Sequence, residues 1–309
     1  MSNNGPSSRV EMTPGSIRID GRILRFAVSN NESPGESEQT WAINLHGFFA
    51  GGGMYWRESQ ELASRLGWRV INPSLPGFGG SDPLPWGSIG LDEIASDIGQ
   101  LLDHLTVSPV VVLGHSMGGA VAIAFGRMFA NRTLGIIYRD GAATPGWRNR
   151  RGWIPALIAP VMPDLAAPID LLAAVALDVP DLLLGRSGST IWSLVPDVRK
   201  NIRTLGRTIP VGSLLMTIDQ REQIRELVAR ERIPILAEWG CFDRVAHRAT
   251  ALEFQEYAKT PVRWVPGGHS WMLARPRSQA DLLCHIQWGR EFVRQITSRA
   301  VQLRSSSVA

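Results

Sequence analysis

The chain has 309 residues, of which 44% are hydrophobic and 19% are charged, a composition typical of a globular protein. Its length allows one large α/β domain with an insertion, or two smaller domains. The net charge is +4, but the basic residues are mixed with 28 acidic ones, which argues against a nucleic-acid-binding surface. Two cysteines, Cys241 and Cys284, form neither a metal-ligand pattern nor a disulfide framework. We therefore expect a cytoplasmic protein.

The first part of the chain predicts a hairpin followed by alternating helices and strands. Residues 1–9 are polar, lack the apolar core of a secretory signal and predict a disordered lead-in. Val10 to Ser29 alternate in polarity, with Asp20-Gly21 as the turn between two strands, and a polar loop over 30–39 follows. The pattern then predicts a strand over 41–45, a glycine-rich loop over 51–53, a helix over 57–66, a strand over 68–72 and a helix over 91–105.

The central segment indicates the fold class. Residues 109–113 form a continuous apolar run, which is expected when both faces of a parallel sheet are covered. A helix over 116–130 and a strand over 134–138 continue the alternation. Strands alternating with helices predict an α/β fold with an open, mostly parallel sheet flanked by helices.

The alternation stops between residues 144 and 231, where proline, leucine and alanine dominate, and this predicts a helical insertion. Aspartates and prolines interrupt its most apolar part, 153–184, so we expect no stable membrane insertion. The predicted division is a core over 1–143 and 232–309, with a cap over 144–231. The second core part predicts a strand over 234–239, a helix over 246–257, a strand over 262–266 and one closing helix whose apolar stripe is Leu282, Ile286, Val293 and Ile296.

A nucleophile motif lies where the strand at 109–113 turns into the next helix. Ser116 is flanked by Gly114 and Gly118, and a tight strand-to-helix turn needs small residues at these two positions. The start of the helix also directs amides and a positive dipole end towards negative charge forming beside Ser116. We therefore predict Ser116 as a nucleophile and the Met117 N–H as an oxyanion-hole donor.

A serine hydroxyl needs a base within hydrogen-bond reach, and His269 is the best of six histidines. It follows a strand on a loop with two glycines, Gly267 and Gly268, that let the backbone reach the sheet edge. The other five histidines are expected to be helix residues or structural: His104, His247 and His285 in helices, His115 pointing away from Ser116, and His46 bracing the oxyanion loop.

The base needs a carboxylate to orient it, and two aspartates compete for this role. Asp243 follows the strand over 234–239 and has the right place in the chain order of serine, acid and histidine. Asp140 closes the preceding strand and could reach the same histidine, although it could equally be a structural turn or cap. We favour Asp243 and keep Asp140 as the alternative acid.

The loop after the strand over 41–45 should supply the second oxyanion donor, and we choose the Phe48 N–H. Phe49 on the same loop and Trp271, just after His269, are the candidate substrate-binding residues. The side chain of Phe48 could also line the acyl pocket, although an aromatic residue on a loop is by default a packing residue.

Five motifs in register resemble the α/β-hydrolase superfamily, and specifically its capped serine hydrolases. They are His46-Gly47, the run from Leu75 to Asp82, the serine turn, Gly240 to Asp243, and Gly268-His269 followed by Arg275-Pro276. The resemblance covers about residues 20 to 300 and implies Ser116, His269 and Asp243 as a triad beneath a cap. Serine at position 116 argues against haloalkane-dehalogenase and epoxide-hydrolase chemistry, whose relatives carry aspartate there.

The resemblance implies hydrolysis of a small to medium hydrophobic carboxylic ester through an acyl-enzyme, with no metal and no organic cofactor. The loop after His46-Gly47 lacks the proline common there and partly resembles the glycine-rich loops of meta-cleavage product hydrolases. Cleavage of a carbon–carbon bond in a ketone substrate is therefore the alternative reaction. A non-catalytic ligand-binding module on the same fold is a third hypothesis, since fold alone does not determine function. A homodimer is compatible with the sequence.

Overall fold

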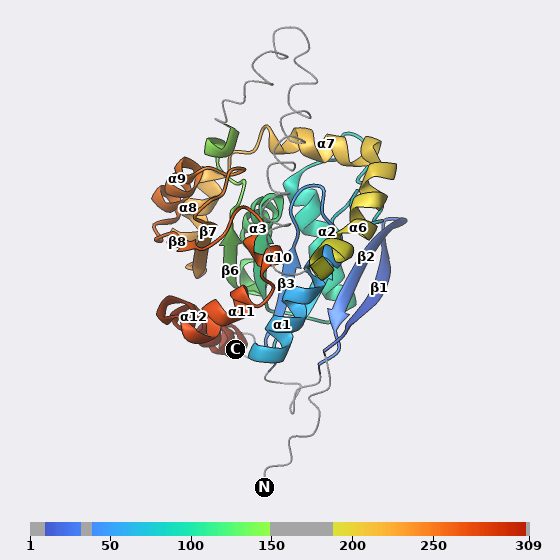
Figure 1. The fold of residues 1–309 in the computed structure, drawn as a ribbon. Coiled ribbons are helices and arrows are strands. Elements are labelled where there is room, and N and C mark those ends of the chain that lie inside the picture. Colours follow the sequence, from blue (N-terminus) through green and yellow to red (C-terminus); the bar gives the residue numbers. More distant parts are fainter. Residues whose placement is uncertain (1–9, 32–38, 149–187, 307–309) are drawn as a thin grey trace.

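The computed structural model describes residues 10–31, 39–148 and 188–306 of the chain (Figure 1). The predicted disordered lead-in over 1–9, most of the loop over 30–39 and the apolar stretch over 153–184 lie outside the described residues.

An eight-stranded sheet runs through the centre of the described part, in the order β1-β2-β4-β3-β5-β6-β7-β8. The first two strands form the predicted hairpin, and β2 also pairs antiparallel with β4, whereas the pairs from β4 to β8 are parallel. The strands are β1 Met12–Ile19, β2 Arg22–Ser29, β3 Trp41–Leu45, β4 Arg69–Pro73, β5 Val110–His115, β6 Thr133–Arg139, β7 Ile235–Gly240 and β8 Arg263–Val265. The predicted α/β class with a mostly parallel sheet is thus confirmed.

Helices cover both faces of this sheet (Figure 1). Alternate residues of β5 point to opposite faces: Val110 and Val112 belong to one buried cluster, and Val111 and Leu113 to another. The first cluster includes residues of α2 (Leu91–His104), α3 (Met117–Met128), α8 (Arg221–Ala229) and α9 (Arg248–Ala258). The second includes residues of α1 (Trp56–Leu66), α11 (Ser278–His285) and α12 (Gln287–Ser306). Burial on both faces explains the unbroken apolar run in β5.

The prediction of a single closing helix is wrong. The chain instead forms α11 and α12, separated at Ile286, whose backbone is extended with φ −91° and ψ 140°. Ile286 is exposed and is not part of an apolar stripe. The break brings Gly289 against the carbonyl of Leu282, where a Cβ atom would lie 2.1 Å from that oxygen. The predicted stripe assumed a continuous helix through Ile286, where the helix is in fact broken.

The described residues of the segment predicted as a cap are helical. They form α6 (Gly188–Arg203), α7 (Leu205–Leu215) and α8, together with a short 3₁₀ helix, η4 (Pro145–Arg148). Of these, α8 packs against α3 and α9, both of which belong to the core. The predicted division into core and cap at 143 and 231 stays a prediction. No helix in the described ranges has both the length and the apolar character needed to cross a bilayer.

Candidate active site

Ser116 lies at the sharp turn between β5 and α3. Its φ is +53° and its ψ is −116°, a conformation that is strained for any residue with a side chain. Its amide donates to the carbonyl of Arg139 at 3.0 Å, and its own carbonyl accepts the amides of Gly119 at 3.0 Å and Ala142 at 3.1 Å. The main chain on both sides therefore holds the half-buried serine in this strained conformation, at the N-terminus of α3.

Close backbone contacts explain the glycines on either side of this turn. A Cβ atom on Gly114 would lie 2.4 Å from the carbonyl oxygen of Gly118, across the turn itself. A Cβ atom on Gly118 would lie 2.2 Å from the carbonyl oxygen of Leu45, at the end of β3. The sequence requirement for small residues at these two positions is thus a requirement for close packing of three backbone segments.

We expect Gly118→Ala to destabilise the protein strongly. The added methyl group would meet backbone atoms of Leu45 and His46, which cannot move without displacing β3. Overpacking of this kind typically costs about 1–3 kcal/mol. Urea unfolding monitored by tryptophan fluorescence measures the loss, and Gly206→Ala, where a Cβ atom would meet nothing within 4 Å, is the matched control. Equal stability of the two variants would contradict this account of the turn.

His269 lies on the loop after β8, and its ring is held by Asp243. Its Nδ1 is 2.9 Å from Oδ2 of Asp243, and both side chains are nearly inaccessible to solvent. The other oxygen of Asp243 accepts the amides of Val245 at 2.7 Å and Ala246 at 2.8 Å. These contacts fix the carboxylate and orient the Nδ1 side of the imidazole towards Asp243.

Asp140, the alternative acid, lies directly behind this pair at the end of β6. Its two oxygens accept the amide of Gly240 at 2.7 Å and the indole N–H of Trp271 at 2.8 Å. Its carboxyl group also lies within 4.8 Å of that of Asp243. Complete burial, and then the negative charge of Asp243, raise the pKa of Asp140 well above its ordinary value. The buried carboxyl of Asp140 therefore holds a proton more readily than an exposed aspartate does.

The predicted oxyanion loop lies beside the serine. A Cβ atom on Gly47 would lie 3.2 Å from Cβ of Ser116, so the chain just before Phe48 passes against Ser116. His46 braces this loop, as predicted: its Nδ1 is 2.8 Å from the carbonyl of Gly47, and its Nε2 accepts the amide of Leu75 at 2.8 Å. Burial lowers the pKa of His46 to about 4, so its imidazole is neutral in these contacts.

The two aromatic candidates for substrate contact occupy different environments. Phe48 and Phe49 are half-buried neighbours, with ring centroids 6.1 Å apart, and Phe49 has a positive φ of 61°. Trp271 is only 1% exposed and directs its indole N–H at Asp140. Substrate contact by Phe49 and Trp271 stays a prediction.

The glycine-rich loop serves as a docking surface for α6. A Cβ atom on Gly51 or Gly53 would lie 2.6 or 2.7 Å from Oδ2 of Asp197. One turn further along α6, Asn201 donates to the carbonyls of Phe49 at 2.8 Å and Ala50 at 2.9 Å. Both residues are buried: Asn201 is completely inaccessible to solvent and Asp197 is 4% exposed. The glycines therefore allow two polar side chains of α6 to approach the backbone of the oxyanion loop.

The family model of the alpha/beta hydrolase fold matches residues 42–276, which include the serine turn, Asp243 and His269. The chain belongs to the α/β-hydrolase superfamily. The match begins inside β3 and ends just beyond His269, so it spans the strands whose ends meet at the site.

Relatives of this α/β hydrolase among characterised and named proteins are distant or cover it in part. The AB hydrolase superfamily protein YisY of Bacillus subtilis is 28% identical over 66% of the chain and 74% of its own length. The magnesium-chelatase 30 kDa subunit of Rhodobacter capsulatus is 42% identical, but over only 26% of the chain and 27% of its own length. A 2-hydroxy-6-oxononadienedioate/2-hydroxy-6-oxononatrienedioate hydrolase of Pseudomonas putida is 36% identical over 36% of the chain and 39% of its own length.

Solved structures share the fold. A bacterial membrane phospholipase A superposes with a TM-score of 0.64 at 18% identity, covering 93% of this chain and 87% of its own. At such low sequence identity, this likeness shows a shared arrangement of sheet and helices and nothing more.

Among the described residues, Asp140, Asp243 and His269 also have the spacing of metal ligands. Their carboxyl and imidazole ligand atoms lie within 4.8 Å of one another. Their atoms are engaged by Gly240, Trp271 and one another. A metal ion would have to displace these hydrogen bonds, so the geometry suits proton transfer better than metal binding.

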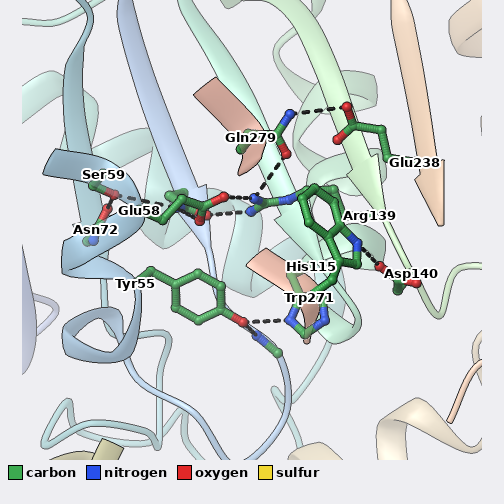
Figure 2. Close-up of polar contacts among 12 residues, drawn as sticks. Tyr55, Glu58, Ser59, Asn72, His115, Arg139, Asp140, Glu238, Trp271 and Gln279 are labelled. Atoms are coloured by element: carbon green, nitrogen blue, oxygen red, sulfur yellow. Dashed lines mark hydrogen bonds and ion pairs between the residues drawn. The ribbon is translucent and has the colours of Figure 1, made fainter. Parts of the chain in front are cut away.

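A buried polar cluster lies beneath the site in this hydrolase, on the side of the sheet that faces α1 and α11 (Figure 2). Arg139, completely buried, forms an ion pair with Glu58 and donates to the side chain of Asn44 at 2.7 Å. Gln279 links Arg139 to Glu238, donating to that carboxyl at 3.1 Å. Arg139 and Glu58 thus neutralise each other, and Glu238 forms no ion pair with any residue that the structure describes.

We expect Glu238→Gln to remove a pH dependence of stability. Burial raises the pKa of Glu238 to about 8 from 4.5, so between these values the folded chain binds a proton that the unfolded chain releases. The contribution of this group is therefore fully present below pH 4.5 and is lost as pH rises towards 8, with a slope of at most about 1.4 kcal/mol per pH unit.

The measurement is the difference in free energy of unfolding between wild type and Glu238→Gln, taken from urea titrations at pH 5, 6.5 and 8. Other titrating groups are shared by both proteins and cancel in this difference. The variant should gain stability relative to wild type with each step up in pH. A difference that stays constant would mean that Glu238 is ionised throughout.

Sequence reasoning placed the main candidates near one another but missed several of their partners. One edge of the sheet carries the serine turn, His46, His269, Asp243 and Asp140, as chain order suggested. The partners that it missed are Tyr55, Asp197, Asn201 and the contact of Trp271 with Asp140. Only the glycines at 51 and 53 carried a signal for any of these, because a glycine run often marks close approach of another group.

Proposed function

We propose that the protein is a serine hydrolase that cleaves small to medium hydrophobic carboxylic esters, with Ser116, His269 and Asp243 as its triad. The observation that carries this proposal is the 2.9 Å contact of His269 Nδ1 with Asp243, on loops that adjoin a strained serine turn. A histidine oriented in this way can act as a general base, and Ser116 directly follows His115, whose ring centroid lies 4.8 Å from that of His269.

The reaction begins when the hydroxyl of Ser116 attacks the ester carbonyl and gives its proton to Nε2 of His269. The negative charge that develops on the carbonyl oxygen is stabilised by the amides of Met117 and Phe48. His269 then donates the proton to the leaving alkoxide, and the C–O bond breaks to leave an acyl-enzyme. Water, deprotonated by His269, then attacks the acyl group. The bond from the acyl carbon to Oγ of Ser116 breaks, His269 returns the proton to Oγ, and the acid is released.

Asp243 stabilises the imidazolium that forms in both steps. Its carboxylate accepts two backbone amides through one oxygen and faces Nδ1 of His269 with the other. This arrangement supports Asp243 as the triad acid, whereas Asp140 accepts from Gly240 and Trp271.

The experiment is labelling with a fluorophosphonate probe, followed by kinetics on p-nitrophenyl esters of increasing acyl length. We expect covalent modification of Ser116, identified by peptide mass spectrometry, and turnover of short esters. Tight binding of a hydrophobic ligand without labelling or turnover would instead favour a non-catalytic binding module.

Carbon–carbon bond hydrolysis is the second candidate. Two observations favour it: the glycine-rich loop after His46-Gly47, and the partial match to a Pseudomonas putida hydrolase whose name refers to an oxo-dienedioate substrate. A substrate panel separates the two reactions. Turnover of a vinylogous 1,5-diketone much faster than that of any ester would replace the ester proposal, while Ser116 and His269 would keep their roles.

A further inference from the structure

A chain of buried hydrogen bonds runs through Tyr55 and His115, whose contact is drawn in Figure 2. The amide of Gly47 donates to the hydroxyl of Tyr55 at 3.3 Å, and this hydroxyl lies 2.6 Å from Nδ1 of His115. Nε2 of His115 lies 2.9 Å from the carbonyl oxygen of His269. The exposed fractions of Tyr55, His115 and His269 are 1%, 3% and 7%, so water competes little for these bonds. The chain joins three segments that are far apart in the sequence.

The direction of each bond follows from the protonation state of His115. Burial, and then the proximity of His269, Arg139 and His46, lower the pKa of His115 well below its ordinary value, so the ring is neutral. A neutral imidazole has one N–H and one acceptor nitrogen. The carbonyl of His269 can only accept, which assigns the proton to Nε2. Nδ1 therefore accepts from the Tyr55 hydroxyl, whose oxygen accepts the amide of Gly47.

Each end of this chain is attached to a part of the proposed machinery. Gly47 immediately precedes Phe48, whose amide is the proposed oxyanion donor, and Gly47 itself lies against Cβ of Ser116. His115 immediately precedes Ser116, and the bond to the carbonyl of His269 acts on the backbone of the proposed base. The rings of His115 and His269 also lie side by side, with centroids 4.8 Å apart.

We propose that Tyr55 and His115 are positioning residues, which hold the oxyanion loop and the backbone of His269 in register with Ser116. The proposal rests on the function proposed above. The three loops of the site follow different strands, so the sheet alone does not set their spacing to the accuracy that catalysis needs. A displacement of about 1 Å at a reacting group can cost up to a hundredfold in rate.

The first test is Tyr55→Phe, which removes the hydroxyl and keeps the ring. We expect kcat for a p-nitrophenyl ester to fall roughly 10- to 100-fold, with KM changed less than about threefold. Affinity for a boronic acid, which forms a tetrahedral adduct with an active serine, should fall by the same factor as kcat, because the adduct depends on the oxyanion loop.

Tyr138→Phe is the matched control. Tyr138 is also completely buried, and its hydroxyl also accepts a backbone amide, that of Ala143 at 2.9 Å. Both variants should lose similar stability on thermal unfolding. Only Tyr55→Phe should lose kcat and boronic-acid affinity, and equal kinetic losses in the two variants would reduce Tyr55 to a structural residue and overturn the proposal.

A second pair of variants tests the two hydrogen bonds of His115 separately. In His115→Gln the side-chain amide can still donate to the carbonyl of His269, whereas His115→Phe removes both contacts. We expect His115→Gln to retain several-fold more kcat than His115→Phe, and the double variant Tyr55→Phe/His115→Phe to be no worse than His115→Phe alone. Additive losses would show that the two residues act separately. If Tyr55→Phe does not fold, the comparison of the two His115 variants decides the question.

These outcomes are distinguishable from failure of the proposed function. If fluorophosphonate does not label Ser116 in the wild type, the hydrolase proposal itself is wrong. If labelling and turnover depend on Ser116 but are unaffected by Tyr55→Phe and His115→Phe in folded protein, only the positioning role is wrong.

Discussion

Replacing Ser116 with alanine is expected to lower kcat for ester hydrolysis by about a millionfold, to the level left by binding alone. The reason is that the remaining groups can orient a substrate but cannot form the acyl-enzyme. Fold and stability should change little, because alanine meets the same strained φ of +53° and the close contacts of the turn belong to the glycines beside it. Progress curves with p-nitrophenyl butyrate and fluorophosphonate labelling of the folded variant measure the effect.

A neighbouring serine provides the control for this experiment. Ser270 is buried and follows His269 directly, so it shares the solvent environment of the site but does not lie on the serine turn. Labelling should persist in Ser270→Ala and disappear in Ser116→Ala. Retention of activity and labelling in the Ser116 variant would assign the nucleophile to another residue.

Asp243→Asn is expected to lower kcat by about ten-thousandfold, whereas Asp140→Asn should retain most of the activity. In the first variant the amide can present its N–H to His269, so the ring adopts the wrong tautomer and Nε2 carries a proton when it should accept one. In the second, the contact between Asp243 and Nδ1 of His269 is kept. The two variants thus distinguish the acid that orients the base from the one that supports it.

Asp140→Asn should nevertheless be less stable than the wild type. The oxygens of Asp140 accept from Gly240 and Trp271, and an amide nitrogen cannot accept, so one of these buried donors loses its partner. An unsatisfied buried donor costs about 1–3 kcal/mol. Urea unfolding measures this cost, and kcat measured on both variants under one condition measures the catalytic difference. A larger kcat loss in Asp140→Asn than in Asp243→Asn would exchange the two roles.

The sequence predicted those parts of the site whose requirements are local. The turn at Ser116 needs glycines two positions away on each side, and the strand before it is apolar on both faces, so the pattern is readable within a dozen residues. Asp243 and His269 followed from chain order along the sheet. The hairpin turn at Asp20-Gly21 was predicted for the same local reason, and both residues have positive φ.

The parts that the sequence did not predict depend on contacts between distant segments. Tyr55 and His115 are separated by 60 residues, and His115 and the carbonyl of His269 by 154. Each of these residues alone has the pattern of an ordinary core position. The break at Ile286 was missed for a related reason, because the close contact between Gly289 and Leu282 arises only when α11 and α12 have folded against each other.

The contact of α6 with the glycine-rich loop bears on how such an enzyme could be re-engineered. Asp197 and Asn201 reach the backbone of residues 49 to 53, so the segment that contains α6 is not an interchangeable module. A chimera that receives this segment from another family member would leave the carbonyls of Phe49 and Ala50 without donors unless the graft carries an equivalent aspartate and asparagine one helical turn apart. Transplanting substrate preference onto this scaffold therefore requires those two positions to travel with it, or to be kept.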